Sequence, residues 1–113
     1  MDFQISEKQL SPKNAVITLS GRLTAATAPQ LRDKIKQFVE ADTTELLLDI
    51  HAVTFLDSSG LAAMVSGLKS ARERGGWLRL AGAAPQVASV FKLTMLDRVF
   101  ELYPSVDAAL AGK

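Results

Sequence analysis

The chain has 113 residues, of which 48% are hydrophobic, with 13 lysines and arginines against 12 aspartates and glutamates and no cysteine. This length and composition predict a single soluble globular domain spanning residues 1–113. The absence of cysteine excludes disulfides, thiolate zinc sites and thiol nucleophiles, and the interleaved charges argue against a basic face for nucleic acid.

The first part of the chain predicts a β-hairpin followed by a helix. FQISEKQL (3–10) alternates apolar and polar residues, AVITLSGRL (15–23) is rich in β-branched residues, and the turn residues SPKN separate them. TAPQLRDKIKQFVEAD (27–42) has apolar residues at helical spacing, and Thr27 with Gln30 three residues later predicts a capping box.

A second strand and helix pair occupies the middle of the chain. ELLLDIHAV (45–53) is almost continuously apolar, which is typical of a strand covered on both faces. A helix is predicted from Ser58 to the Gly75-Gly76 pair, where glycine suits a left-handed C-cap. Its apolar residues recur at helical spacing: Leu61, Met64, Val65 and Leu68.

The last part of the chain continues the alternation. Two further strands are predicted, at WLRLAGA (77–83) and VFELY (99–103). A helix is predicted between them at PQVASVFKLTML (85–96). A last helix, started by Ser105, is predicted at SVDAALAG (105–112). The order β-β-α-β-α-β-α-β-α indicates an α/β fold with about four helices. We expect one mixed sheet, in which the leading hairpin is followed by right-handed parallel β-α units.

The stretch FLDSSGLAAM (55–64) lies where a strand passes into a helix. Asp57, Ser58 and Ser59 are all favoured N-cap residues, yet one cap residue is enough for one helix. Gly60 allows the backbone to approach a neighbour closely. Capping alone is therefore one interpretation of this turn, and a nucleophile, a phosphate-binding corner or a phosphorylation site are the others.

Enzymatic interpretations of the turn find little support in the sequence. A nucleophilic Ser58 would need a base, and His51 is the single histidine of a chain that lacks G-x-S-x-G. No glycine-rich phosphate loop occurs, so ATP would have to come from another protein. No cofactor, metal or small-molecule substrate is expected, because carboxylates do not cluster at ligand spacing.

A phosphate on Ser58 would suit the turn better. It adds roughly −1.5 to −2 charges, which the N-terminal end of a helix accommodates. A partner bound over the same turn would have to desolvate the dianion, which weakens binding without unfolding the chain.

LDSSGLAAM after the apolar strand LLLDI resembles the phosphorylation motif of bacterial anti-sigma factor antagonists, which are small members of the STAS family. The resemblance covers essentially the whole chain, including LSGRL and the GG turn before WLRLAG. It implies a STAS-like fold and a protein that switches partners. Such a protein binds an anti-sigma factor with serine kinase activity and releases it when the first serine, here Ser58, is phosphorylated. A metal-dependent serine phosphatase then restores the unmodified form.

The resemblance also implies a docking surface around the turn. Asp57, Ser59 and Gly60 would support the turn, and the surface would comprise Thr24, Ala25, Ala26, Thr27, Phe55, Leu56 and Leu61. Family members often carry an acid in the loop, as G-x-L-D, whereas this chain has Gly21-Arg22-Leu23-Thr24, which bears on the identity of the partner. The alternative within the family is a STAS subunit of a transporter or regulatory complex that never turns over phosphate.

The expected location is the cytoplasm. MDFQISEKQL lacks the basic and apolar segments of a secretory signal. No apolar run reaches the roughly 20 residues of a membrane-spanning helix, so no membrane insertion is expected.

Overall fold

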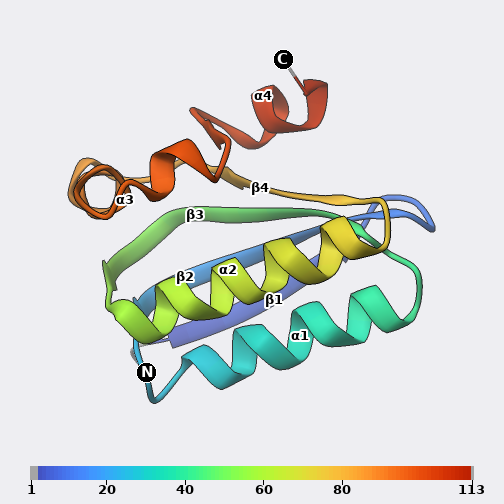
Figure 1. The fold of residues 1–113 in the computed structure, drawn as a ribbon, viewed down its shortest axis with the longest axis horizontal. Helices are drawn as coiled ribbons and strands as arrows, with labels where there is room; N and C mark the ends of the chain where they lie inside the picture. Colours follow the sequence, from blue (N-terminus) through green and yellow to red (C-terminus); the bar gives the residue numbers. More distant parts are fainter. Residues whose placement is uncertain (1–2, 113) are drawn as a thin grey trace.

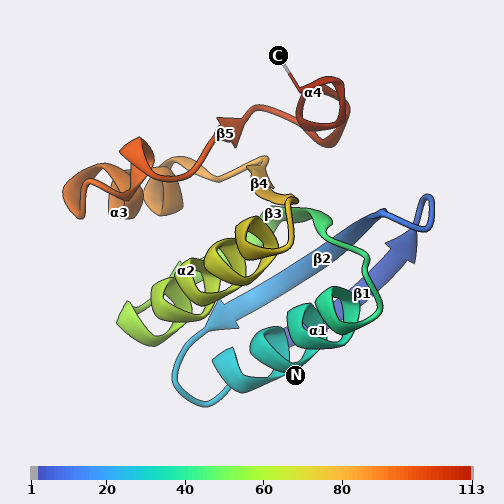
Figure 2. The ribbon, with the colours of Figure 1, turned by 45° about the vertical axis from the view of Figure 1, so that its right-hand side comes forward.

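The most apolar segments of the chain form the centre of the sheet. The computed structural model describes residues 3–112. Its central strands pair in parallel; they are β2 (Asn14–Leu23), β3 (Glu45–Leu56) and β4 (Trp77–Ala81). The antiparallel β1 (Phe3–Gln9) and the short parallel β5 (Leu102–Tyr103) form the edges. The strand order is β1-β2-β3-β4-β5 (the strands are labelled in Figures 1 and 2), which confirms the predicted mixed sheet with a leading hairpin.

Helices cover the sheet unequally on its two faces. The two long helices, α1 (Ala28–Glu40) and α2 (Ser58–Glu73), lie side by side on one face (Figures 1 and 2). The short α4 (Val106–Ala111) covers the other face near β4 and β5, and α3 (Pro85–Leu93) packs against β3. Within residues 3–112, no helix combines the length and the apolar character that crossing a bilayer requires.

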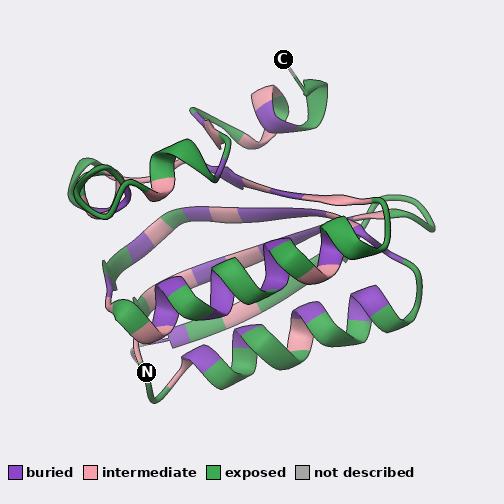
Figure 3. Cartoon of the chain, in the orientation of Figure 1, coloured by how far each residue is buried: buried purple, intermediate pink, exposed green. Residues whose placement is uncertain are grey.

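Burial on both faces explains the almost continuous apolar sequence of β3. Leu46, Leu48 and Ile50 point into the main core beneath α1 and α2, whereas Leu47 points into a smaller core beneath α4. All four side chains are fully buried, which confirms the predicted covered strand. Figure 3 shows the matching pattern in α1 and α2, whose buried residues alternate with exposed ones along each helix.

The start of α1 differs from the predicted capping box. The Thr27 hydroxyl makes no cap hydrogen bond; it donates to the carbonyl of Arg22 at 2.8 Å and accepts from the N–H of Thr24 at 2.9 Å. The reason is the backbone of Thr27, which is already helical (φ −113°, ψ −20°) instead of extended as in a usual N-cap. Its side chain therefore stabilises the preceding loop.

One residue and two segments also differ from what the sequence predicts. Val65 is 37% exposed, because α2 contacts the sheet and α1 and leaves a third side uncovered. The helix predicted over 85–96 ends at Leu93, since Met95 has φ +62° and interrupts it before a 3-10 turn at Leu96–Arg98. The last strand contains two residues of the predicted 99–103.

The turn between α2 and β4 needs glycine at two positions for different reasons. Gly75 has φ +81°, as predicted for a left-handed C-cap, with no atom within 4 Å of an ideal Cβ. At Gly76 a Cβ would lie 1.9 Å from the carbonyl oxygen of Thr44. The same oxygen accepts the N–H of Trp77 at 2.9 Å, so the close approach starts the pairing of β4 with β3.

We predict that Gly76→Ala lowers the free energy of unfolding by about 3 kcal/mol or more, because its Cβ would overlap a backbone carbonyl. Gly75→Ala is the matched control and should lower it by about 1–2 kcal/mol, since only the left-handed backbone is penalised. Urea denaturation of both variants measures the difference, and equal losses would contradict the close approach.

Candidate functional site

The D-S-S-G turn lies at the carboxyl end of β3, which passes directly into α2. Open α/β sheets place their ligand sites at this edge. Ser58 is exposed, Asp57 and Ser59 are half-buried, and Gly60 is buried. The side chain of Ser58 is therefore the most accessible of the four residues.

Asp57 is the N-cap of α2 and uses both of its carboxylate oxygens. Oδ1 accepts the N–H of Gly60 at 3.0 Å, and Oδ2 accepts the N–H of Ala25 at 3.3 Å in the loop between β2 and α1. The N–H of Asp57 donates to the carbonyl of Leu23 at 3.2 Å. Among residues 3–112, the hydroxyls of Ser58 and Ser59 make no hydrogen bond. Capping is thus performed by Asp57 alone and leaves both serines free.

Gly60 lets the first turn of α2 approach the end of β2. A Cβ at this position would lie 2.8 Å from the carbonyl oxygen of Leu23 and 2.6 Å from Cδ1 of Leu56. Because one of these contacts is with backbone, no side-chain movement alone could relieve it. Glycine therefore allows the turn and the β2–α1 loop to be neighbours.

The β2–α1 loop is held in place beside the turn. The N–H of Ala28 donates to the carbonyl of Thr24 at 2.7 Å, in addition to the two hydrogen bonds of the Thr27 hydroxyl described above. Thr24 and Thr27 are half-buried, whereas Ala25 and Ala26 are exposed. The structure thus places side by side the loop and the turn that the family resemblance implies as parts of one docking surface.

A shallow cavity of about 360 Å³, called here the Ser58 hollow, lies between the turn, the loop and α1. It is lined by Ala25, Ala28, Pro29, Arg32, Ser58, Ser59 and Ala62. Arg32 and the other α1 residues carry no sequence signal of this position, because the first turn of α1 comes to lie beside α2 only in the folded chain.

Of the three large apolar residues in the predicted surface, only Phe55 is exposed. Its side chain is 41% exposed, and the guanidinium of Arg22 lies 4.3 Å from its ring centroid, across the β2–β3 pairing. Leu56 and Leu61, also predicted to face a partner, are 5% and 8% exposed and belong to the core. Little of either side chain remains for contact with another protein.

His51 does not approach Ser58 as a catalytic base would. Its Nδ1 lies 2.7 Å from Oδ1 of Asp49, and its side chain is 65% exposed. Among residues 3–112, no hydrogen bond joins His51 to Ser58, and no three His, Asp or Glu residues gather as metal ligands would.

The sequence pattern of the STAS domain matches residues 6–109, so the chain belongs to the STAS domain family. The anti-sigma-B factor antagonist of Listeria monocytogenes is 28% identical over 112 residues, which cover 99% of this chain and 97% of the relative. The crystal structure of an anti-sigma factor antagonist from Mycobacterium paratuberculosis is 28% identical, with a TM-score of 0.86 and coverage of 97% and 92%. The Bacillus cell fate determinant SpoIIAA in its phosphorylated form is 20% identical, with a TM-score of 0.76 and coverage of 96% and 97%.

We predict that Asp57→Ala lowers the free energy of unfolding by about 1–2 kcal/mol, because the cap of α2 is lost. The bond to the N–H of Ala25 is lost as well, so the Ala25 amide should exchange its hydrogen faster. Urea denaturation and amide exchange measured by NMR check the two effects.

Asp33→Ala is the matched control, since Asp33 is an exposed residue of α1, and it should change stability by less than about 0.5 kcal/mol. Unchanged exchange at Ala25 in Asp57→Ala would contradict the role of Asp57 in holding the loop.

Proposed function

We propose that this protein is an anti-sigma factor antagonist that switches partners by phosphorylation and has no enzymatic activity of its own. It binds an anti-sigma factor with serine kinase activity in the cytoplasm while Ser58 is unmodified, and it releases this kinase once Ser58 carries a phosphate. The observation that carries the proposal is an exposed serine hydroxyl at a helix start whose cap is already supplied by Asp57.

The free hydroxyl makes Ser58 a suitable phosphate acceptor. The kinase transfers the γ-phosphoryl group of ATP to Oγ of Ser58, a base of the kinase takes the hydroxyl proton, and ADP leaves. A metal-dependent phosphatase later directs water at the phosphorus, which returns the hydroxyl and releases inorganic phosphate. Ser59 is half-buried and therefore less accessible to the kinase than Ser58.

The phosphate repels the partner without unfolding the antagonist. No hydrogen bond of the native turn involves the Ser58 hydroxyl, so its modification breaks none of the turn's hydrogen bonds. The partner surface proposed here comprises the turn, the loop from Thr24 to Thr27 and the exposed ring of Phe55. A dianion in this surface must be desolvated on binding, which weakens the affinity by about 100-fold or more.

The relatives support the proposal. Anti-sigma-B factor antagonist is the name of the Listeria monocytogenes relative, and SpoIIAA has been solved in a phosphorylated form. The chain covers nearly the whole length of both proteins.

The direct test incubates the protein with each serine-kinase anti-sigma factor encoded in the same genome, with ATP and Mg²⁺. We expect one kinase to modify Ser58, as mapped by mass spectrometry, and to dissociate from the product. Ser58→Ala should bind this kinase as the wild type does and stay bound when ATP is added. Ser58→Asp should bind at least about 10-fold more weakly, because one negative charge reproduces part of the effect of phosphate.

Ser59→Ala is the matched control and should still be phosphorylated and released. Phosphate found at another residue, or equal binding of Ser58→Ala and Ser58→Asp, would refute the switch. A chain that binds a partner stably and is never modified would instead be the non-switching STAS subunit of a transporter or regulatory complex.

A further inference from the structure

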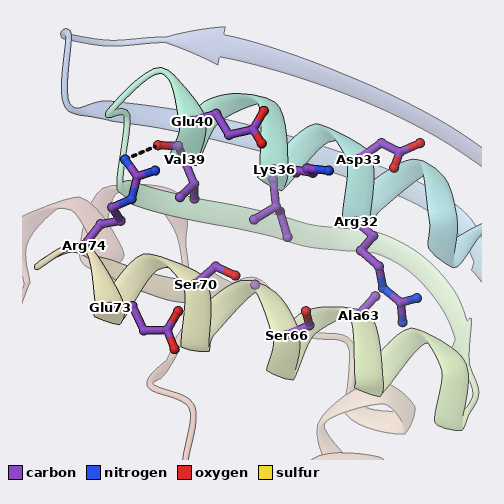
Figure 4. Close-up of a pocket in the computed structure, with 12 residues that line it drawn as sticks. Arg32, Asp33, Lys36, Val39, Glu40, Ala63, Ser66, Ser70, Glu73 and Arg74 are labelled. Atoms are coloured by element: carbon purple, nitrogen blue, oxygen red, sulfur yellow. Dashed lines mark hydrogen bonds between the residues drawn. The ribbon is translucent and has the colours of Figure 1, made fainter.

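The Ser58 hollow contains one charged residue among those that line it, Arg32 of α1. Arg32 lies in the second turn of α1 and also lines the groove between α1 and α2. Figure 4 shows its side chain reaching from α1 toward α2 beside Ala63, at the end of the groove nearer the start of α2. A cation is therefore placed in the same hollow as the proposed phosphate acceptor.

Arg32 has no partner in the part of the chain that the structure describes. Three of the five other arginines are engaged: Arg74 pairs with Asp42 at 2.9 Å, Arg79 lies 3.4 Å from Glu101, and Arg22 stacks on Phe55. Arg32 is exposed and makes no ion pair or hydrogen bond within residues 3–112. Its guanidinium is thus free to take up an anion near Ser58.

The hollow that Ser58 and Arg32 both line has room for a phosphate. Ala25, Ala28 and Ala62 are small, and the cavity is roughly ten times the liquid volume of one water molecule. The carboxylate of Asp57, the nearest acid in sequence, is taken up by the N–H groups of Gly60 and Ala25. No acidic residue lines the hollow to compete for Arg32.

We propose that Arg32 is the intramolecular counter-cation of phosphorylated Ser58. Its planar guanidinium donates two N–H groups to phosphate oxygens, the geometry in which arginine binds phosphate most strongly. The inference rests on the proposed phosphorylation of Ser58 and adds a regulatory consequence. While Ser58 is unmodified, Arg32 is available to pair with an acidic group of the partner. Once Ser58 is phosphorylated, Arg32 pairs with the phosphate and is no longer available to the partner.

The test uses protein in which phosphoserine is inserted at position 58 during translation, so that no kinase is required. The second pKa of the phosphate, ordinarily about 6, is followed by ³¹P NMR during a pH titration. A neighbouring cation favours the dianion and lowers this pKa, so Arg32→Gln should raise the pKa by about 0.5 unit or more. Arg32→Lys keeps the charge and should restore at least half of the difference.

Lys36→Gln is the matched control, because Lys36 follows on the same helix, lines the groove and does not line the Ser58 hollow. It removes the same charge one turn away and should shift the phosphate pKa by less than half as much as Arg32→Gln. No shift in Arg32→Gln, or an equal shift in both variants, overturns the proposal. Neither result bears on whether a kinase modifies and releases the wild-type chain, so the two proposals fail separately.

Discussion

The carboxylate of Asp57 holds together the two segments that form the site. One oxygen caps α2 through the N–H of Gly60, and the other accepts the N–H of Ala25, which lies 32 residues earlier in the chain. Buried or half-buried carboxylates that accept two N–H groups fix backbone geometry strongly. Without this bridge, the turn and the end of β2 would be joined by the hydrogen bond from the N–H of Asp57 to the carbonyl of Leu23 and by the close packing of Gly60 on Leu23.

This arrangement separates the helix cap, Asp57, from the proposed phosphate acceptor, Ser58, which follows it directly in the chain. Asp57 satisfies the helix N-terminus, so the hydroxyl of Ser58 contributes no hydrogen bond to the fold and is free to change its charge. Proteins whose modified residue is also structural lose stability on modification. In the proposed switch, the phosphate acceptor and the structural group are adjacent but independent, which would allow the binding surface to change while the fold is retained.

The site is supported by the rigid part of the molecule. β3 is buried on both faces from Leu46 to Leu48 and keeps one face in the core as far as Leu56, and α1 and α2 pack side by side on the main core (Figure 3). The proposed docking surface would thus lie at the edge of this scaffold and would need no rearrangement to be recognised. A charge added to such a surface would change the affinity for a partner directly, at the atoms that the partner contacts.

Local patterns in the sequence determined the order of the elements, the hairpin and the covered strand β3. They also determined the C-cap at Gly75 and the polar turn at the start of α2. All of these features depend on near neighbours in the chain. The tertiary structure decided what depended on distant residues. By sequence, Asp57, Ser58 and Ser59 were equally good caps for α2. In the folded chain Asp57 is the cap, and its second hydrogen bond is accepted from the N–H of Ala25, a residue distant in the chain. Phe55 is exposed while Leu56 and Leu61 are buried, because strand pairing and the packing of α2 set their directions. Arg32 and Ser58 line the same hollow because α1 and α2 pack side by side, and no pattern within either helix records that proximity.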